Sequence, residues 1–242
     1  PPLATPPPAA HAASPVPHLD AAAVRRLLPV EVALEAAALA LRSLSDGSGT
    51  MPVRSVMKLP VEQLGLLACM PSCLGEHACC KTQTVFPANA GGPLSAHQGA
   101  VLLFSTADGR LLSVSDAHEV TLRRTAAASA VATRALSRDV PSVLALLGTG
   151  PQALAHLEAI RAVRSITRVH VWGRNPARAA AVASAVAAAA GLPVRVCESA
   201  QEAVAEADIV CTLTSAQAAV LEGGWLKPGA HVRTTQLEGG EI

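Results

Sequence analysis

Short apolar runs alternate with stretches of helical periodicity along the second half of the chain, and this alternation predicts a parallel sheet with helices on its faces. Each apolar run has the length of a buried strand, and each is followed by residues that favour a helix. The predicted strands cover residues 143–147, 168–172, 194–197 and 209–213. The predicted helices begin after Pro151 and cover residues 176–190 and 199–207. The second half is therefore expected to be an α/β unit.

The first half has a different pattern, which predicts an α+β unit built on an antiparallel or mixed sheet. Asp20 is a fair N-cap for a short helix that runs through Leu28, and Pro29 precedes a second helix. Further along, Asp108-Gly109 favours the turn of a hairpin. The predicted elements are a helix at 30–45, strands at 53–59, 64–70 and 79–86, a loop at 88–93, hairpin strands at 99–105 and 111–115, and a helix at 120–136.

These patterns divide the chain into three parts. Residues 1–17 are rich in Pro and Ala, carry no Asp, Glu, Lys or Arg, and are expected to be a disordered leader rather than a secretory signal. The α+β unit is expected to span residues 18–140. The long helix at its end is expected to carry the chain into the α/β unit, which spans residues 141–242.

Composition and charge narrow the class of protein. Half of the residues are apolar but only 2% are aromatic, so the core must consist mainly of Ala, Val and Leu. The net charge of +1 does not indicate binding to nucleic acid or to a membrane surface, and no apolar run is long enough to span a membrane. The cysteines lack the spacing of a zinc site, so we expect reduced thiols in the cytoplasm and no metal. They are Cys69, Cys73, Cys79, Cys80, Cys197 and Cys211.

The link between the strand at 143–147 and the helix after it reads Gly148-Thr149-Gly150-Pro151-Gln152-Ala153, which is the G-x-G-x-x-A dinucleotide fingerprint. The first glycine allows the tight turn, and the second lets a pyrophosphate approach the backbone. The N-terminus of the following helix offers free N–H groups and the positive end of its dipole. The fingerprint therefore predicts a Rossmann-type dinucleotide-binding domain.

Two strand ends of this domain carry polar candidates. Arg174 follows the second strand, where an NAD site would carry Asp or Glu, and no acidic residue lies between Arg161 and Arg195. An arginine at this place can bind a 2′-phosphate, which favours NADPH. Thr212 lies near the end of the fourth strand, where a hydroxyl can bind the cofactor or cap the next helix.

Three cations in the first half stand among apolar residues: Arg54, Lys81 and Arg124. Together they could bind the carboxylate of an amino or imino acid, because Arg and Lys donate charge-assisted hydrogen bonds to carboxylates. Spacing alone favours the ordinary alternative, in which each cation reaches solvent or a nearby carboxylate. His97 and His156 are expected to be structural, and no arrangement of Ser, His and Asp indicates hydrolysis.

Five segments of the chain, in the same order, resemble those of the ornithine cyclodeaminase/μ-crystallin family. They are SAHQGAVLLF, TLRRTAAASAVAT, LLGTGPQALAH, QEAVAEADIVCT and WLKPGAH. The resemblance covers about residues 19–232 and implies a homodimer in which a substrate domain lies beside a Rossmann domain. It implies reduction of cyclic ketimines by hydride transfer from NADPH, with NADH as the alternative cofactor, and thyroid-hormone binding in the same pocket.

Carried over residue by residue, the resemblance implies that Arg54, Lys81 and Arg124 bind the substrate, with Lys81 as the candidate catalytic residue. The resemblance therefore favours a shared substrate site for these cations, whereas their spacing alone favours ordinary contacts with solvent or a nearby carboxylate. The positions that it implies for cofactor contact are Ala96, His97, Arg124, Thr125, Gly148, Thr149, Gly150, Pro151, Gln152, Gly173, Arg174, Asn175, Thr212 and Leu213.

The chain departs from the family after His231. The family continues with Asn-Ala-Val-Gly and, in the cyclodeaminases, an acidic catalytic residue, whereas this chain continues with Arg233-Thr234-Thr235-Gln236 and ends at Ile242. We therefore expect the C-terminal part of the family fold to be missing. Imine reduction is the leading hypothesis, and a thyroid-hormone-binding or lens structural protein with NADPH as a ligand is the alternative. Ornithine cyclodeamination is disfavoured because no Asp occupies the expected place.

Overall fold

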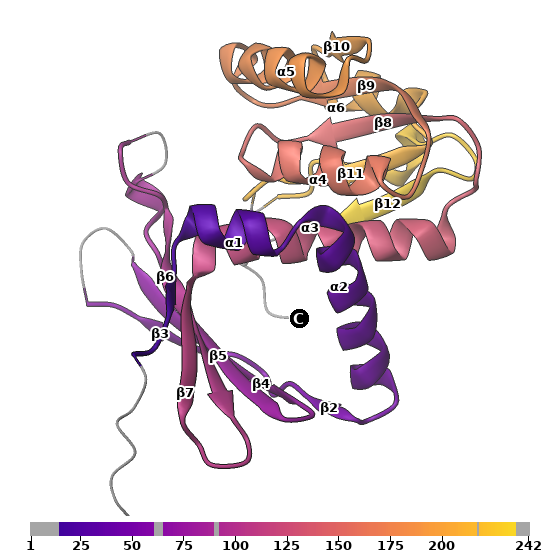
Figure 1. Cartoon of the computed structure of the whole chain (residues 1–242). Coiled ribbons are helices and arrows are strands. Elements are labelled where there is room, and N and C mark those ends of the chain that lie inside the picture. The colour runs from indigo at the N-terminus through magenta and orange to yellow at the C-terminus, as the bar shows by residue number, and fades with distance from the viewer. Residues whose placement is uncertain (1–14, 61–64, 90–91, 217, 236–242) are drawn as a thin grey trace, which may run out of the picture.

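A computed structural model describes residues 15–60, 65–89, 92–216 and 218–235. The chain forms two lobes joined by a long helix, α3 (Ala117–Leu136), as Figure 1 shows. Residues 1–14, which make up most of the expected leader, lie outside the described residues. Within the described ranges every helix is too short or too polar to cross a bilayer, and no three His, Cys, Asp or Glu side chains are grouped to hold a metal ion.

The first lobe combines two helices with a mixed sheet, in agreement with the expected α+β pattern. The helices are α1 (Ala21–Leu27) and α2 (Val30–Ser45), and the Asp20 side chain caps α1 by accepting a hydrogen bond from the Ala23 N–H at 2.8 Å. The sheet strands in the described part of the chain are β1 (His18–Leu19), β2 (Gly49–Thr50), β3 (Ser55–Lys58), β4 (Leu66–Leu74), β5 (His77–Val85), β6 (His97–Ser105) and β7 (Leu111–Asp116). Their order is β1-β7-β6-β5-β4-β2, with β3 paired to β4, and β1 is parallel to β7.

Strands β4 and β5 form one long hairpin, so the predicted strand ends at residues 70 and 79 are wrong. The strands meet at Gly75, whose φ of +56° lies in the left-handed region that favours glycine. Pro71 lies inside β4, although proline has no N–H to donate to a sheet. It lies where the second partner of β4 changes from β3 to β2, and a missing N–H is tolerated at such a gap in the ladder.

Two further boundaries differ from the predictions. A short 3-10 helix, η1 (Pro87–Asn89), occupies the start of the expected loop at 88–93. Helix α3 begins three residues before the predicted position 120, because the Asp116 side chain accepts a hydrogen bond from the Glu119 N–H at 2.7 Å and so caps an earlier turn.

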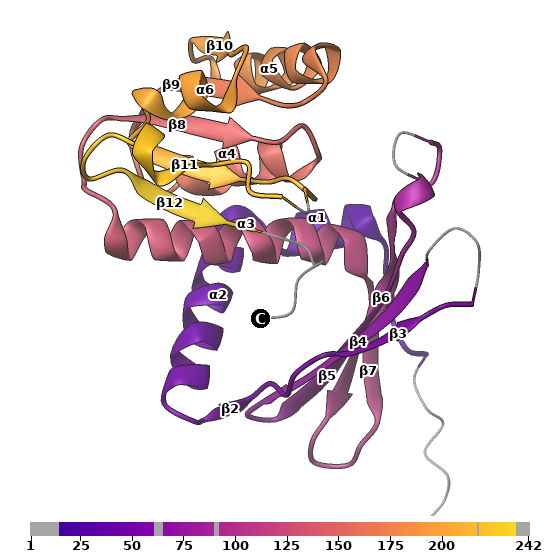
Figure 2. The ribbon, with the colours of Figure 1, turned by 180° about the vertical axis from the view of Figure 1, so that it is seen from behind.

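The second lobe is a parallel sheet with helices, as the alternating pattern predicts. Its strands among the described residues are β8 (Ser142–Leu147), β9 (Ile166–Trp172), β10 (Val194–Val196), β11 (Ile209–Thr212) and β12 (His231–Thr234), in the order β10-β9-β8-β11-β12. Its helices are α4 (Gln152–Arg161), α5 (Pro176–Ala190), α6 (Ala200–Ala205) and the 3-10 helix η2 (Gly223–Trp225). Strand β12 was not predicted, because Val232 is its one aliphatic residue. Figure 2 shows that β12 lies beside α3.

Successive residues of the central strand β8 pack on opposite faces of this sheet, as a doubly covered sheet requires. Leu144 and Leu146 belong to the core that includes α3, α4 and α5, whereas Ala145 and Leu147 belong to the core that includes α6. All four side chains are fully buried. The end of β8, where the dinucleotide loop begins, is therefore held from both sides.

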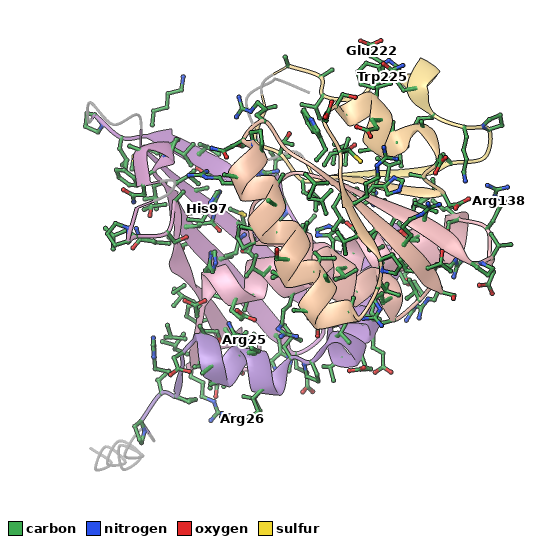
Figure 3. The ribbon with its side chains drawn as sticks, turned by 90° about the horizontal axis from the view of Figure 1, so that it is seen from above. Arg25, Arg26, His97, Arg138, Glu222 and Trp225 are labelled. Carbon is green, nitrogen blue, oxygen red and sulfur yellow. The ribbon has the colours of Figure 1, made fainter. Side chains whose placement is uncertain are left out.

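The N-terminal part of α3 is tied to α1 by a buried carboxylate, Glu119, which is 4% exposed. Glu119 Oε2 accepts a hydrogen bond from Arg25 Nη2 at 2.8 Å, and Oε1 accepts one from Arg123 Nε at 3.0 Å. Figure 3 shows Arg25 on α1. Burial alone would raise the pKa of Glu119, but the two guanidinium groups hold it below its ordinary value. The carboxylate therefore stays charged and fixes the position of α3 against the first lobe.

The other end of α3 is capped by a single side chain of the second lobe, Arg164. Its guanidinium donates hydrogen bonds to the carbonyl oxygens of Arg134 (2.7 Å), Ser137 (3.0 Å) and Arg138 (3.2 Å). The last carbonyl groups of a helix have no partner within the helix, so a fixed donor satisfies them. Arg164 is only 9% exposed, which shields these bonds from water.

We expect Arg164→Ala to lower the free energy of unfolding by about 3 kcal/mol, because buried carbonyl groups would lose charge-assisted hydrogen bonds. Chemical denaturation monitored by circular dichroism measures this change. Arg161→Ala is the matched control, since Arg161 is an exposed residue of α4. Equal destabilisation by both changes would contradict the capping role of Arg164.

Candidate functional site

The dinucleotide loop lies at the exit of β8, between Leu147 and the first residue of α4. Gly148 has a φ of +142°, and a Cβ placed on it would come within 2.6 Å of the Leu213 carbonyl oxygen. A Cβ on Gly150, in contrast, would meet no atom within 4 Å. Gly148 is therefore needed for the turn itself, whereas the space at Gly150 is open to a ligand at the N-terminus of α4.

The ends of β9 and β11 support this loop from both sides. The Gly148 N–H donates to the Trp172 carbonyl at 2.8 Å, and the Leu213 N–H donates to the Leu147 carbonyl at 2.7 Å. A Cβ on Gly173 would lie 2.4 Å from Thr149 Cγ2, so any larger residue there would have to displace the Thr149 side chain. The structure thus brings the fingerprint together with the strand ends that the sequence indicates.

The remaining candidates near these strand ends have different settings. Arg174 is exposed after β9, as a phosphate-binding side chain would be. Asn175 uses its side chain to cap α5, because its Oδ1 accepts a hydrogen bond from the Arg178 N–H at 3.0 Å. Thr212 is buried, and its carbonyl accepts a hydrogen bond from the Thr235 hydroxyl at 3.0 Å.

Two of the expected cofactor-contact residues carry buried polar atoms that have no hydrogen-bond partner among the described residues. They are Thr125 Oγ1 on α3 and Gln152 Oε1 in the first turn of α4. Buried polar atoms in native proteins are almost always satisfied, and each exception calls for a ligand, a water or a function. The open space at Gly150 and these two atoms fit a polar nucleotide bound across the N-terminus of α4.

The three candidate cations line one pocket of the first lobe. From their spacing alone, each was expected to reach solvent or a nearby carboxylate instead. Arg54 precedes β3, Lys81 lies on β5 and Arg124 lies on α3. The other lining residues are Leu66, Ala68, Met70, Gln83 and Val85. Lys81 Nζ donates hydrogen bonds to Thr121 Oγ1 at 3.1 Å and to Gln83 Oε1 at 3.3 Å, which fix the ammonium group at the junction of sheet and helix.

The electrostatics of this pocket favour an anion. Desolvation by the surrounding protein lowers the pKa of Arg124, and the charge of Arg54 lowers it further, although Arg124 keeps an exposed surface. The three cations repel one another, and a negative group bound between them would offset this repulsion. The pocket is therefore suited to a small carboxylate.

The stretch that contains Ala96 and His97 reaches the same region. Val85, which lines the pocket, is the register partner of His97 at the start of β6. Paired residues of neighbouring strands project to the same face, so His97 shares the pocket face of the sheet. The Ala96 carbonyl accepts a hydrogen bond from the Phe86 N–H at 2.8 Å, and Figure 3 shows where His97 lies on the first-lobe sheet.

A row of hydroxyl groups along α3 connects the pocket with the second lobe, and sequence reasoning singled out only Thr125 among its members. Its members are four residues apart: Thr121, Thr125, Ser129 and Thr133. Thr121 contacts Lys81, whereas Ser129 Oγ lies 3.0 Å from His156 Nε2, and Thr133 Oγ1 lies 3.2 Å from His231 Nε2. Residues at this spacing share one face of a helix, and that regularity was the signal available in the sequence.

His156 has the structural role that was expected for it. The side chain is fully buried, with Nδ1 2.9 Å from the Gln152 carbonyl and Nε2 bonded to Ser129. Burial is the main cause that lowers its pKa to about 4, and the nearby Arg233 lowers it further. The imidazole is therefore neutral at physiological pH and packs α4 against α3.

A family model, curated proteins and solved structures all show similarity to this chain. The model of the ornithine cyclodeaminase/mu-crystallin family matches residues 18–238. The ketimine reductase mu-crystallin of Rattus norvegicus is 38% identical over 201 residues, which cover 82% of this chain and 63% of the relative. The chain thus spans less than two thirds of the length of that relative.

Solved structures show the same fold. The Δ1-pyrroline-2-carboxylate reductase of Thermococcus litoralis, in complex with NADH and L-proline, superposes with a TM-score of 0.87 and 28% identity, covering 91% of this chain and 69% of that chain. An archaeal alanine dehydrogenase dimer with bound NAD superposes with a TM-score of 0.81 and 29% identity, covering 90% and 66% of the two chains. Both of these structures hold a nicotinamide cofactor, and the Thermococcus litoralis reductase also holds an amino acid.

Proposed function

Because the chain belongs to the ornithine cyclodeaminase/mu-crystallin family, we propose that it reduces the C=N bond of a cyclic ketimine that carries a carboxylate. The observation that carries this proposal is the pocket lined by Arg54, Lys81 and Arg124, which shares helix α3 with the dinucleotide-binding lobe. A reduced nicotinamide, when bound, would supply the hydride for the imine carbon, and a proton from the site or solvent would complete the secondary amine at nitrogen.

The residues of the chain have separable tasks in this proposal. The backbone at Gly150 and the Thr125 and Gln152 side chains would hold the nucleotide, because they provide open space and unpaired polar atoms. Arg54 and Arg124 would bind the substrate carboxylate. Lys81 would either share that carboxylate or assist protonation of the imine nitrogen, which makes the imine a better electrophile.

The test is the loss of reduced-nicotinamide absorbance on mixing the protein with Δ1-pyrroline-2-carboxylate and either NADPH or NADH. We expect turnover and formation of proline. A thyroid-hormone-binding or lens structural protein would bind nucleotide or iodothyronine without turnover, and a cyclodeaminase would convert ornithine instead. Absence of imine reduction in a folded protein that binds the nucleotide would overturn the proposal.

The proposal extends to a preference for NADPH. Arg174 is exposed directly after β9, and no acidic residue follows that strand before α5. We expect Arg174→Ala to raise the KM for NADPH about tenfold and to leave the KM for NADH nearly unchanged, because one charge-assisted contact to the 2′-phosphate is lost. Steady-state kinetics with both nucleotides measures this difference.

Arg178→Ala is the matched control for Arg174→Ala, since Arg178 is an exposed arginine in the first turn of α5. It should change neither KM by more than about twofold, because exposed charges contribute little at this distance. An equal loss of NADPH and NADH affinity in Arg174→Ala would indicate general nucleotide binding rather than recognition of the 2′-phosphate.

We also propose a homodimer formed through the outer face of the first-lobe sheet. Lys81 contacts α3, so its neighbour Cys80 projects to the face of the sheet that points away from α3. On that face Cys80 pairs with Leu102 of β6, and Leu102 pairs with Val114 of β7. The Leu102 and Val114 side chains are partly exposed. A second copy would bury this apolar surface. Light scattering should give the mass of a dimer for the parent and of a monomer for Leu102→Glu; a monomeric parent would contradict the proposal.

The proposal places the protein in the cytoplasm. All six cysteines are free, including the adjacent Cys79 and Cys80 on β5. Free thiols persist where glutathione and thioredoxin keep them reduced, and this supports a reducing compartment.

A further inference from the structure

Gln83 is a buried, uncharged polar residue in the lining of the pocket that holds Arg54, Lys81 and Arg124. It is 4% exposed and lies on β5, two residues from Lys81, so both side chains project to the same face of the sheet. A buried amide is unfavourable unless its polar atoms find partners, and the partners of each end of this amide therefore indicate what it does.

The sheet leaves room for this side chain on the pocket face. The register partners of Gln83 on the two neighbouring strands are Ala68 of β4 and Gly99 of β6. A Cβ on Gly99 would lie 2.8 Å from Gln83 Cα, so the two strands approach closely at this point. Paired residues project to the same face of a sheet, so the Gln83 amide lies between an alanine and a residue without a side chain.

The contact with Lys81 fixes which way the amide points. Lys81 Nζ donates a hydrogen bond to Gln83 Oε1 at 3.3 Å. An ammonium group can only donate, so the amide oxygen must face Lys81, and the NH2 group is the other end of the amide. Among the described residues the side-chain hydrogen bond of Gln83 is made by Oε1, so the Nε2 donors have no protein acceptor there. Because Gln83 lines the pocket, a ligand in the pocket can reach these donors.

We infer that Gln83 is a binding residue for the substrate carboxylate, to which its Nε2 donates a hydrogen bond while its Oε1 holds Lys81 in place. This rests on the proposed function. A carboxylate has about four acceptor sites, so three cations leave room for a further donor. A neutral donor suits this place, because a fourth cation would add to the repulsion among the other three, and a carboxylate would repel the substrate.

The first test replaces the amide by an apolar side chain of similar length, in Gln83→Met. The probes are Δ1-pyrroline-2-carboxylate as substrate and pyrrole-2-carboxylate as a planar analogue without an imine bond. We expect the KM for the substrate and the Kd for the analogue to rise about tenfold each, because one hydrogen bond to a charged group is lost. Steady-state kinetics and calorimetric titration of the nucleotide-bound protein measure the two constants, and thermal melts check that the fold is retained.

The second test keeps the shape of the side chain and changes its charge, in Gln83→Glu. The new carboxylate would lie beside Lys81 and repel the ligand, so we expect the Kd for pyrrole-2-carboxylate to rise about 100-fold or more at neutral pH. Gln98→Glu is the matched control, because Gln98 is an exposed glutamine of the neighbouring strand β6 and lies outside the pocket lining. It adds the same charge and should change the Kd by less than about twofold.

Three results would overturn the inference. They are parental KM and Kd in Gln83→Met, a fall in kcat with an unchanged Kd for pyrrole-2-carboxylate, and equal losses of affinity in Gln83→Glu and Gln98→Glu. The second of these would show that Gln83 acts only through Lys81, and the third that net charge rather than the pocket is responsible; each leaves imine reduction standing. If the parent reduces no imine but binds pyrrole-2-carboxylate in a Gln83-dependent way, the carboxylate contact stands and the proposed function falls.

Discussion

Lys81→Met is expected to lower kcat/KM for a cyclic ketimine by about 100-fold and to leave the melting temperature nearly unchanged. The ammonium group is held by Thr121 and Gln83 inside the pocket that also contains Arg54 and Arg124. Methionine keeps most of the length and volume of the side chain but removes its charge and its donors. The change therefore tests the chemistry of the pocket rather than its packing.

Lys58→Met is the matched control for this experiment, because Lys58 is an exposed lysine of β3 outside the pocket lining. It should retain parental kinetics. The split between KM and kcat then separates the two roles that remain open for Lys81. A rise confined to KM indicates carboxylate binding, whereas a fall in kcat with a changed pH profile indicates assistance to protonation. Equal kinetics in Lys81→Met and the parent would remove Lys81 from the reaction.

Substitutions at the two fingerprint glycines should have opposite effects on folding and on nucleotide binding. We expect Gly148→Ala to lower the free energy of unfolding by about 3 kcal/mol or more. The φ of +142° disfavours any residue with a Cβ, and the added Cβ would lie 2.6 Å from the Leu213 carbonyl oxygen. Gly150→Val should leave the stability of the free protein nearly unchanged, because a Cβ there meets no atom within 4 Å.

The effect of Gly150→Val should appear when nucleotide is added. Saturation of the parent at 100 times its Kd would stabilise the folded state by about 2.7 kcal/mol, and this gain should be lost in the variant because the new side chain occupies the open space at the N-terminus of α4. Thermal melts with and without NADPH measure both effects. A normal nucleotide-dependent shift in Gly150→Val would show that the diphosphate does not approach this glycine.

The parallel sheet could be predicted from the sequence because its central strands are buried on both faces and read as apolar runs. Residues 143–147 and 209–213 correspond to β8 and β11 within one residue at each end. Edge strand β12 has one aliphatic residue and depends on pairing with β11, which is a tertiary property. The continuation of β4 beyond residue 70 is also a tertiary property, because the gap between β2 and β3 that accommodates Pro71 exists only in the folded sheet.

The candidate site also has parts that the sequence could predict and parts that depend on the folded structure. The fingerprint is local, so its loop could be placed from adjacent residues alone. The three cations are far apart in the sequence, and their spacing indicated no common site, whereas the family resemblance did. The unpaired atoms of Thr125 and Gln152 are a consequence of packing α3 against α4, which no residue pattern encodes.

The single helix that carries both halves of the site has a consequence for how relatives of this protein can diverge. Arg124 lines the pocket with Arg54 and Lys81, and the adjacent Thr125 carries a buried hydroxyl, without a partner among the described residues, that is a proposed nucleotide contact. Each residue added to a helix rotates everything beyond it by about 100°. Point substitutions at the exposed end of α3, residues 134–136, should therefore accumulate freely. An insertion or deletion between Thr121 and Thr133 would turn the pocket residues and the proposed nucleotide contacts away from each other and should be eliminated by selection.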